Sequence, residues 1–147
     1  MPSFTLRHLN AIAGRMPFNR LVGLRIVRQH RDGVTIECSV RDELRNGLGV
    51  LHGGVTATMA DAAVGIAVVN HFEGKRAATT VEMKLNYFLP VENGKIVARA
   101  RLIRTGKTLC VGCVDLFDDR KRLVAAALAT YMLLPDMPLP NRVKETS

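Results

Sequence analysis

A short segment places a histidine, two glycines and a carboxylate at a spacing that could carry out chemistry. His52-Gly53-Gly54 comes at the start of a helix predicted over residues 51–71, and Asp61 lies near the middle of that helix. The first N–H groups of a helix have no intrahelical acceptor and carry a partial positive charge, and glycine allows a reacting group to approach them. Asp61 interrupts an apolar run, where a carboxylate must be paired, hydrogen-bonded or neutralised. An oxyanion-binding helix start together with a base or nucleophile is typical of an acyl-transfer hydrolase.

Two other interpretations of this segment compete with the catalytic one. A run of about 20 mostly apolar residues has the length of a transmembrane helix. However, Asp61 lies near its midpoint, where a charge costs about 2.5–3.5 kcal/mol, and no cluster of basic or aromatic residues flanks the run. We therefore expect no membrane insertion. A structural role, in which the Asp61 carboxylate caps a neighbouring element, stays open at this point.

The composition indicates one globular domain in a reducing compartment. The chain has 147 residues, of which 48% are apolar and 23% charged, which suits one ordinary core and is too short for two domains. Residues 3–16 mix charged and apolar side chains and lack the continuous apolar core of a signal peptide. Three cysteines, an odd number, argue against a disulfide framework and predict a cytoplasmic protein.

The cysteines and histidines show no convincing metal-binding pattern. Cys110-Val-Gly-Cys113 has the spacing of half a zinc or redox site, but it lies in a predicted strand. Side chains three residues apart on a strand point to opposite faces, so the two thiols are expected to diverge. No second cysteine pair completes a zinc site, and the four histidines are dispersed. We expect neither a metal nor a cofactor.

The charge balance predicts an anionic partner. The chain has 21 basic and 13 acidic residues, which gives a net charge of +8. The basic residues are spread along the sequence, and two tyrosines and five phenylalanines give no interleaved aromatic pattern for base stacking. We therefore expect no nucleic-acid partner, since a phosphate-rich small molecule accounts for the charge equally well.

Periodicity and turn residues predict the order helix, two strands, one long helix and four strands. The first helix covers residues 3–16 and ends at Pro17, and a hairpin of residues 24–30 and 34–40 follows. A loop over residues 41–50 precedes the long helix. Four strands are expected over residues 79–89, 95–104, 107–117 and 122–134, with Asn93-Gly94 as a hairpin turn leading into the second of them. An antiparallel sheet curved around the long helix, an α+β fold, would bury that helix on most sides.

A set of spaced residues makes the chain similar to a known family. Asn46 stands six residues before His52-Gly53-Gly54, Asp61 stands nine residues after His52, and the strand over residues 79–87 and the segment over residues 104–108 follow in order. In these features the sequence resembles the hotdog-fold acyl-CoA thioesterases, in the group of the phenylacetate-pathway (PaaI-like) and thioesterase-superfamily-member enzymes. The resemblance implies a hotdog domain over residues 23–134, preceded by a helical lead-in over residues 1–22 and followed by a tail over residues 135–147.

The resemblance also implies a role for each residue of the motif. Asn46 and the backbone N–H of Gly53 would polarise the thioester carbonyl. Asp61 would activate a water or attack directly, and the hydroxyl of Thr80, at a position where close relatives can have serine, would orient that water. His52 would order the loop around the carbonyl site. From the residues alone, Asn46 could simply hold a turn, and threonine suits any strand.

Coenzyme A binding is implied for two further segments. They would hold the pantetheine arm and the nucleotide, and they consist of Tyr87, Phe88, Leu89, Pro90 and Val91 in the first and Arg104, Thr105, Gly106, Lys107, Thr108 and Leu109 in the second. Arg104 and Lys107 could also be no more than a solvated strand end. The expected activity is hydrolysis of an acyl-CoA thioester to the free acid and coenzyme A. The acyl group stays undetermined among aromatic, medium-chain and long-chain types.

Two alternative functions stay open. The first is a non-catalytic acyl-CoA binding module, against which the complete set of Asn46, Gly53, Asp61 and Thr80 argues. The second is a hotdog-fold hydratase or dehydratase acting on acyl thioesters, which would need His52 as a base. The position of His52 directly before Gly53-Gly54 fits the thioesterase pattern better.

The spacing along the long helix predicts a shared active site. Gly53 and Asp61 are eight residues apart, which corresponds to about 12 Å of helix rise. Both groups must lie within about 3 Å of the reacting carbonyl or its water. One straight helix cannot arrange this, whereas two antiparallel helices in a two-fold dimer can. We expect a homodimer as the minimal unit and a homotetramer, a dimer of dimers, as the assembly.

Overall fold

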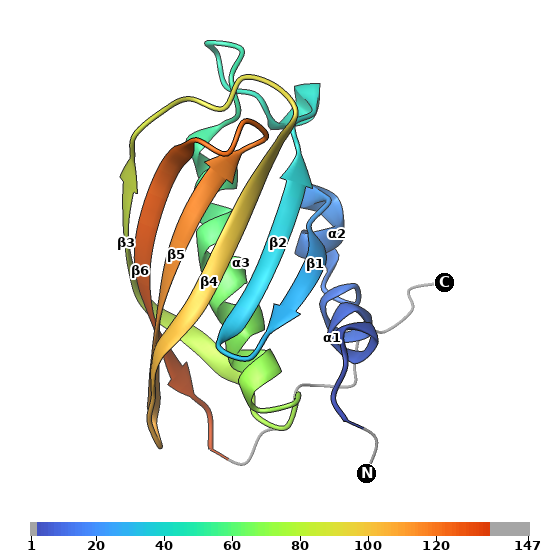
Figure 1. Cartoon of the computed structure of the whole chain (residues 1–147), viewed down its shortest axis with the longest axis vertical. Coiled ribbons are helices and arrows are strands. Elements are labelled where there is room, and N and C mark those ends of the chain that lie inside the picture. Colours follow the sequence, from blue (N-terminus) through green and yellow to red (C-terminus); the bar gives the residue numbers. More distant parts are fainter. Residues whose placement is uncertain (1–2, 136–147) are drawn as a thin grey trace.

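Six antiparallel strands form a curved sheet that wraps around one long helix (Figure 1). This computed structural model describes residues 3–135, so residues 136–147 of the predicted tail lie outside the described part. Across the sheet the strands follow the order β1-β2-β4-β5-β6-β3. In chain order the elements are α1 (Leu6–Ala13), α2 (Pro17–Val22), β1 (Arg25–His30), β2 (Gly33–Ser39), the short 3-10 helix η1 (Asp42–Leu44), α3 (Gly53–His71), β3 (Ala78–Tyr87), β4 (Lys95–Thr105), β5 (Leu109–Asp118) and β6 (Leu123–Leu133). The predicted α+β hotdog architecture is confirmed.

The N-terminal segment forms two helices where the sequence predicts one. The first, α1, is shorter than the expected range of residues 3–16, and a second helix, α2, begins at Pro17. Helix α1 ends at Ala13, with Gly14 as its C-cap, so Pro17 does not end it as the sequence predicts. The fixed φ and missing N–H of proline instead suit the first position of a new helix. Pro17 therefore marks the start of the second helix and not the end of the first.

The predicted hairpin at Asn93-Gly94 is wrong. Strand β3 pairs with β6, whereas β4 lies between β2 and β5, so β3 and β4 are not neighbours. Gly94 does turn the chain, with φ of +76°, a value that glycine adopts readily. Its carbonyl accepts a hydrogen bond of 2.9 Å from the backbone N–H of Val40, at the end of β2. A turn sequence determines only that the chain reverses direction at that point. Which strands pair with each other depends on how the sheet packs around α3.

Helix α3 forms the core of the domain. Met59, Ala60, Ala63, Val64 and Ala67 are fully buried, and the helix contacts strands β2 to β6. At 19 residues and a mean hydropathy of 1.3 it is long and apolar enough to cross a membrane. The helix nevertheless lies against the sheet of its own chain (Figure 1). Its apolar side chains belong to the buried core, which accounts for its composition.

One stripe of α3 is not covered by the sheet. Thr58, Asp61, Ala62 and Gly65 share one face of the helix, because Thr58 is three and four residues before Asp61 and Ala62, and Gly65 is four and three residues after them. All four are partly exposed. Within the described chain, β3 pairs on one side only, with β6. The uncovered stripe and the free strand edge together define where the candidate site lies.

Candidate active site

The carboxylate of Asp61 is held by two hydroxyl groups from neighbouring strands. Thr80 Oγ1 on β3 donates a hydrogen bond of 2.8 Å to Asp61 Oδ1, and Tyr131 on β6 places its hydroxyl 2.8 Å from the same oxygen. The Tyr131 hydroxyl is also 2.8 Å from the backbone carbonyl oxygen of Asp61. Within residues 3–135, Asp61 Oδ2 forms no hydrogen bond and no ion pair. The structure thus brings Asp61 and Thr80 together, as expected, and leaves one carboxylate oxygen available.

A β-bulge in β3 directs Thr80 toward α3. Met83 and Leu85 pack against the core, so simple alternation would place Val81, not Thr80, on the inner face. The pairing with β6 shifts between Thr80 and Glu82, which leaves Val81 as the extra residue, 55% exposed. Thr80 is consequently paired directly with Tyr131, and both side chains reach the same side of the sheet. Bulges commonly re-aim a side chain in this way next to active sites.

Tyr131 is a candidate site residue that the sequence does not reveal. It is 7% exposed, and its pKa is raised above the usual range, mainly because burial disfavours the phenolate; the nearby Asp61 carboxylate adds to the increase. The hydroxyl therefore stays protonated and donates. Its position opposite Thr80 across β3 and β6 could have identified it only once the strand pairing was known.

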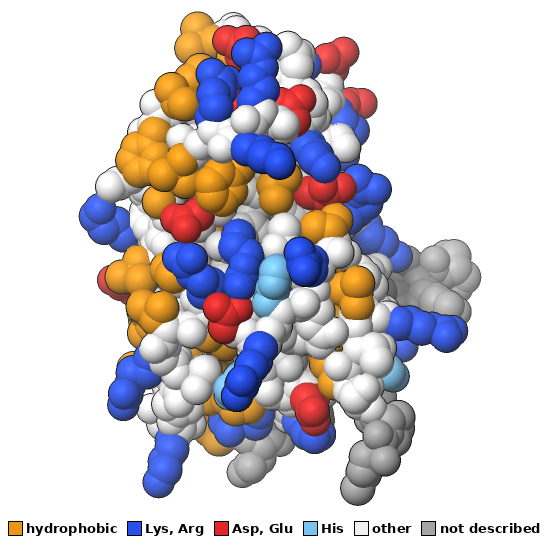
Figure 2. Space-filling model, in the orientation of Figure 1, with side chains coloured by type: hydrophobic (Ala, Val, Ile, Leu, Met, Phe, Trp, Pro, Cys, Tyr) orange, Lys and Arg blue, Asp and Glu red, His pale blue; other side chains and the backbone are white. Residues whose placement is uncertain are grey.

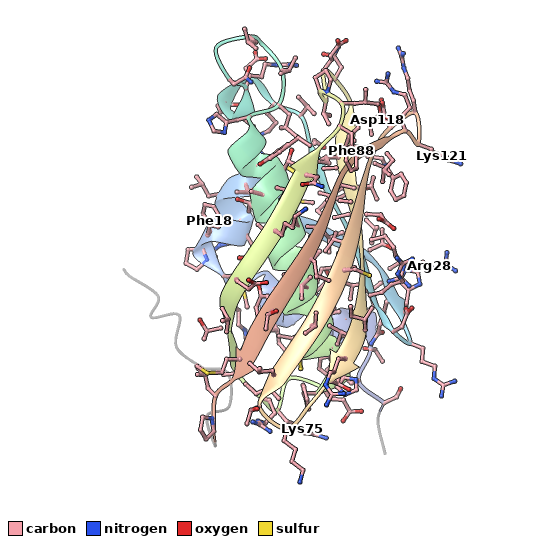
Figure 3. All side chains as sticks on the ribbon, turned by 90° about the vertical axis from the view of Figure 1, so that its left-hand side faces the viewer. Phe18, Arg28, Lys75, Phe88, Asp118 and Lys121 are labelled. Carbon is pink, nitrogen blue, oxygen red and sulfur yellow. The ribbon has the colours of Figure 1, made fainter. Side chains whose placement is uncertain are left out.

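Asp61, Thr80 and Tyr131 line a largely apolar cleft of about 330 Å³. Its remaining walls come from α2, from the uncovered stripe of α3 and from the start of β3: Met16, Phe18, Asn19, Thr58, Ala62, Gly65, Ile66, Val69, Ala78 and Thr79. Figure 3 shows Phe18 projecting from α2 on the flank of α3. A polar centre with an apolar extension is the usual form of a site for an amphipathic small molecule.

A second cleft of about 310 Å³ contains the other half of the predicted motif. Asn46 and Gly53 line it together with the segment from Tyr87 to Val91. The side-chain oxygen of Asn46 accepts hydrogen bonds from the backbone N–H groups of Leu48 (2.9 Å) and Val50 (3.3 Å). Asn46 therefore does hold a turn, and this geometry turns its amide NH₂, a donor of two hydrogen bonds, away from the turn.

The start of α3 offers an N–H group at Gly53. Gly53 is the first residue of the helix, so its N–H precedes the first intrahelical hydrogen bond. His52 caps the helix, and its Nδ1 accepts a hydrogen bond of 2.8 Å from the N–H of Gly54. The neutral ring then carries its proton on Nε2. On the other side, the hydroxyl of Tyr87 donates to the carbonyl oxygen of Gly53 at 2.7 Å.

The two halves of the motif do not meet within one chain. Both Gly53 and Asp61 belong to the uninterrupted helix α3, where eight residues correspond to about 12 Å. The residues lining the Gly53 cleft and those lining the Asp61 cleft have no member in common. Phe88 is labelled in Figure 3 near the end of the sheet, well away from Phe18, which lines the other cleft.

The two segments expected to bind coenzyme A are also separated within one chain. Tyr87 is paired with Ala125 and Leu109 with Met132, seven residues apart along β6, or about 23 Å. The first segment lines the Gly53 cleft, although Val91 itself is only 4% exposed. The second forms the turn between β4 and β5, where Gly106 N–H bonds the carbonyl of Leu109 at 2.8 Å.

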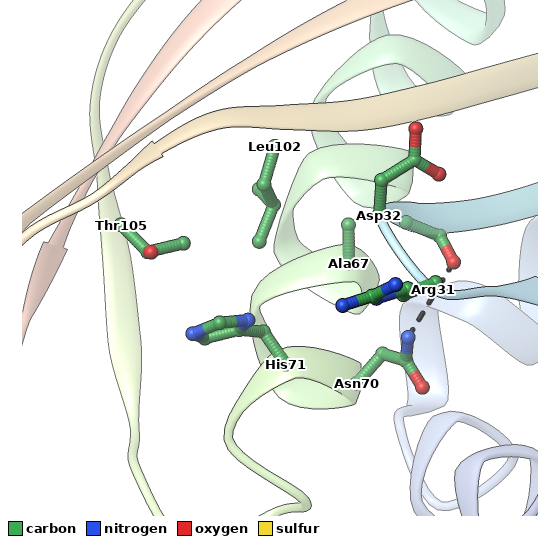
Figure 4. Close-up of a pocket in the computed structure, with 8 residues that line it drawn as sticks. Arg31, Asp32, Ala67, Asn70, His71, Leu102 and Thr105 are labelled. Atoms are coloured by element: carbon green, nitrogen blue, oxygen red, sulfur yellow. Dashed lines mark hydrogen bonds between the residues drawn. The ribbon is translucent and has the colours of Figure 1, made fainter.

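A third cavity, of about 450 Å³, lies elsewhere, between the C-terminal end of α3 and the β1–β2 turn (Figure 4). Of the residues predicted for the site, only Thr105 lines it. The Asn70 amide donates to the carbonyls of His30 (3.2 Å) and Gly33 (3.4 Å), and the Asp32 carboxylate is paired with Arg99. Because the Asn70 amide and the Asp32 carboxylate are held by these contacts, and Asp61, Gly53, Asn46 and Thr80 all lie outside it, this cavity is a weaker candidate for the predicted chemistry than the Asp61 cleft.

The cysteines take the positions that the strand pattern predicts. Cys110 is buried on the inner face of β5, whereas Cys113 is partly exposed on the outer face, so the two thiols diverge. Within residues 3–135, no three His, Cys, Asp or Glu side chains are grouped closely enough to hold a metal ion. The basic side chains are widely spread, as the sequence predicts; Figure 2 shows them along the whole of one face.

Comparison with known proteins connects this geometry to one family. A sequence profile described as the thioesterase superfamily matches residues 48–125. Human acyl-coenzyme A thioesterase 13 is 33% identical over 110 residues, which cover 74% of this chain and 78% of that protein. The medium/long-chain acyl-CoA thioesterase YigI of Escherichia coli K12 is 25% identical over 133 residues, 80% of this chain and 86% of that one.

Solved structures agree with the sequence matches. A thioesterase from Haemophilus influenzae superposes with a TM-score of 0.82 at 25% identity, covering 90% of this chain and 92% of that chain. The PaaI protein of the phenylacetic acid degradation operon of E. coli shares the fold, with a TM-score of 0.79 at 18% identity over 90% of this chain and 99% of that one. The chain therefore belongs to the thioesterase superfamily.

Proposed function

We propose that this thioester hydrolase is an acyl-CoA thioesterase whose active site joins the Asp61 cleft of one chain to the Gly53 cleft of another. The observation that carries the proposal is the Asp61 carboxylate, which lies on a largely apolar helix and is fixed through one oxygen by two hydroxyl groups from the sheet. A carboxylate in such surroundings has a cost in stability, which a catalytic role explains. The relatives named as acyl-CoA thioesterases support the substrate class.

In the proposed reaction, Asp61 acts as a general base. Oδ2 accepts a proton from a water molecule, while Thr80 Oγ1, whose own proton is donated to Oδ1, accepts the water's second hydrogen. The water oxygen attacks the thioester carbonyl, and the resulting oxyanion is stabilised by the Gly53 N–H and the Asn46 amide. Collapse breaks the C–S bond, and the proton on Asp61 passes to the departing coenzyme A thiolate. His52 fixes the start of α3 as its N-cap.

Two copies of the chain would complete the site. Gly53 and Asp61 are separated by about 12 Å along α3, so one chain cannot place both groups next to the same carbonyl. A dimer that pairs the free edges of β3 and sets the two α3 helices antiparallel brings Gly53 of one copy near Asp61 of the other. It would also cover the long β3 edge, which otherwise presents unpaired backbone groups. Further association of dimers is supported by Leu109, Leu128 and Met132, exposed together on the outer face of the sheet.

The acyl group of the substrate would extend through the Asp61 cleft. This cleft follows α3 from Asp61 to Val69, about 12 Å of helix, and its walls beyond the carboxylate include Phe18 and Ile66. We propose an apolar acyl group of medium or greater length, which the name of the E. coli relative supports. The net charge of +8 would attract the phosphates of coenzyme A. We propose that the exposed side chains of Arg104 and Lys107 bind these phosphates.

The geometry disfavours a hydratase or dehydratase. Such chemistry would use His52 as the base, but its Nδ1 is occupied by the Gly54 N–H and its Nε2 carries the proton. Incubation with a panel of acyl-CoA thioesters distinguishes the three functions. A thioesterase releases free thiol, a dehydratase or hydratase interconverts enoyl and 3-hydroxyacyl thioesters, and a binding module does neither.

Replacement of Asp61 tests the assignment of the base. We expect Asp61→Asn to lower kcat for thiol release by about 10²–10⁴-fold, because the amide keeps the shape and the Oδ1 acceptor but cannot take a proton. Its thermal stability should match or exceed that of the wild type, since an amide is easier to bury than a charge. Glu82→Gln, an exposed carboxylate of β3 next to the bulge, is the control and should keep full activity. An Asp61→Asn variant with wild-type turnover would rule out the proposed base.

A further inference from the structure

We propose that Tyr131 is a positioning residue for the Asp61 carboxylate and that glycine at position 65 is required to accommodate its phenol ring. The proposal rests on the thioesterase activity proposed above. It assigns to Tyr131 the task of fixing Oδ1, so that Oδ2 is held toward the reacting water in the cleft.

The contacts around the phenol support this role. The Tyr131 hydroxyl lies 2.8 Å from Asp61 Oδ1 and 2.8 Å from the Asp61 carbonyl oxygen, so it meets both the side chain and the backbone of the same residue. Thr80 donates to Oδ1 from the adjacent strand, at the residue directly paired with Tyr131. Two donors on one oxygen restrict rotation of the carboxylate, which neither donor would do as fully alone.

Strand β6 shows that the tyrosine is an exception in its surroundings. Its other inner-face residues beside α3 include Ala125, Ala127 and Ala129, whose small side chains let the helix lie close to the sheet. A large side chain follows at Tyr131, at the level of Asp61. The run of small inner-face side chains on β6 therefore ends at the residue that donates a hydrogen bond to the Asp61 carboxylate.

Gly65 supplies the second, independent observation. A Cβ at this position would lie 2.8 Å from the Tyr131 hydroxyl oxygen and 3.2 Å from its Cε1 and Cζ atoms, so any other residue would displace the ring. Glycine inside a helix is less favourable than alanine, and α3 has alanine at Ala62, Ala63 and Ala67 nearby. Because Gly65 follows Asp61 by one turn, its missing side chain opens the space through which the phenol reaches the carboxylate.

The pH dependence of the reaction offers a readout that simple packing would not change. Among the described residues that line the cleft, Asp61 and Tyr131 are the only titratable ones, and the rest are apolar, hydroxyl-bearing or amide side chains. A hydrogen bond donated to an ionised carboxylate favours its ionised form. Loss of the Tyr131 hydroxyl should therefore move the acid-side decline in kcat to higher pH.

The test uses Tyr131→Phe, Gly65→Ala and the double variant in the full-length protein. Thiol release by the wild type is measured first, because its absence would defeat the proposed function itself, whereas the following outcomes concern Tyr131 alone. We expect Tyr131→Phe to lower kcat roughly tenfold with little change in KM, and to shift the acid limb upward. Gly65→Ala should lower kcat similarly, because the added Cβ displaces the Tyr131 ring, and thermal unfolding is recorded to confirm that the variant folds.

The double variant connects the two residues. If Gly65 matters only because it admits the Tyr131 hydroxyl, adding Gly65→Ala to Tyr131→Phe should cost little further activity, so the two losses should not multiply. An active wild type together with Tyr131→Phe of unchanged kcat and pH profile would overturn the proposal. So would a Gly65→Ala variant of full activity, even if Tyr131→Phe failed to fold.

Discussion

At the scale of single residues, the candidate site is defined by which polar atoms take part in hydrogen bonds within the chain. Thr80 and Tyr131 both bind Asp61 Oδ1, whereas Asn46 uses its own oxygen to bind the loop. Among the described residues, these contacts leave Asp61 Oδ2 and the Asn46 amide NH₂ without a hydrogen-bond partner, and the two residues line different clefts. The proposed chemistry thus depends on which polar atoms are used for internal hydrogen bonds and which remain for the substrate. The role of each hydroxyl group can be tested by a substitution that removes it and keeps the shape of the side chain.

Thr80 permits such a test through two nearly isosteric variants. We expect Thr80→Ser to retain activity within a few-fold, because the hydroxyl that donates to Asp61 remains. Thr80→Val replaces the hydroxyl by a methyl group and should lower kcat at least tenfold, since Oδ1 loses a charge-assisted donor and the water loses an acceptor. Steady-state thiol release is the measurement, with thermal unfolding to confirm that both variants fold. Equal activity of the two variants would show that the Thr80 hydroxyl has no part in the reaction.

The sequence identifies some of these residues and misses others for a physical reason. Asp61 stands out because a carboxylate interrupts an apolar helix, and Thr80 belongs to the spaced motif of the family. Tyr131 sits on a strand rich in small apolar residues, where an aromatic side chain is ordinary core. Its partner is 70 residues away, so the contact exists only after β6 pairs with β3.

At the scale of elements, the short helix α2 forms one wall of the Asp61 cleft. Phe18 lines the cleft and is 56% exposed, whereas Leu21 on the same helix is 71% exposed and does not line it. We expect Phe18→Ala to lower kcat/KM for an apolar acyl-CoA roughly fivefold, because about 1 kcal/mol of apolar contact with the acyl group is lost. Leu21→Ala is the matched control and should leave kcat/KM unchanged.

Comparison of short and long acyl groups sharpens this prediction. If the acyl group passes Phe18, the ratio of kcat/KM for long over short acyl-CoAs should fall in Phe18→Ala and stay constant in Leu21→Ala. Equal losses for all chain lengths would place the acyl group elsewhere. Because Phe18 is largely exposed in the single chain, its loss should change the melting temperature little.

The positions of helices and strands are predictable because apolar patterning is a local property of the sequence. Strand pairing and the β-bulge are not, because they depend on contacts between distant segments. The long helix and all six strands follow from apolar patterning, with boundaries off by a residue or two. Pro17 predicts a helix end but instead begins α2. Asn93-Gly94 predicts a hairpin, although β3 lies at the edge of the sheet beside β6. The bulge at Val81, which reverses the expected face of Thr80, leaves no clear mark in the sequence.

At the scale of the whole molecule, the net charge of +8 should matter for binding more than for turnover. We expect the double variant Arg104→Ala with Lys107→Ala to raise KM for acyl-CoA several-fold with little change in kcat, because a contact remote from the reacting atoms is lost equally from ground and transition states. The wild-type KM should rise with salt, since exposed charges are screened within about 8–10 Å. Arg7→Ala with Arg28→Ala, exposed cations on α1 and β1, is the charge-matched control. A KM that is insensitive to both salt and the Arg104 and Lys107 changes would place the nucleotide elsewhere.

The central claim is that two copies of the chain share each active site, and mixing two inactive variants tests it. Asp61→Asn removes the base, and Gly53→Pro removes the oxyanion N–H. Proline is tolerated at the first position of a helix, and His52, with φ of −60° and ψ of 134°, has the extended backbone that precedes proline. Each variant is first shown to fold, to form dimers and to be inactive alone.

The two variants are then unfolded, mixed in equal amounts and refolded, and thiol release is measured on the mixture. Random pairing makes about half of the dimers mixed, and each mixed dimer has one site with an intact Gly53 from one copy and an intact Asp61 from the other. About a quarter of the wild-type activity should therefore return. If chain exchange is confirmed and the mixture stays inactive, both groups act within one chain and the shared-site account is wrong.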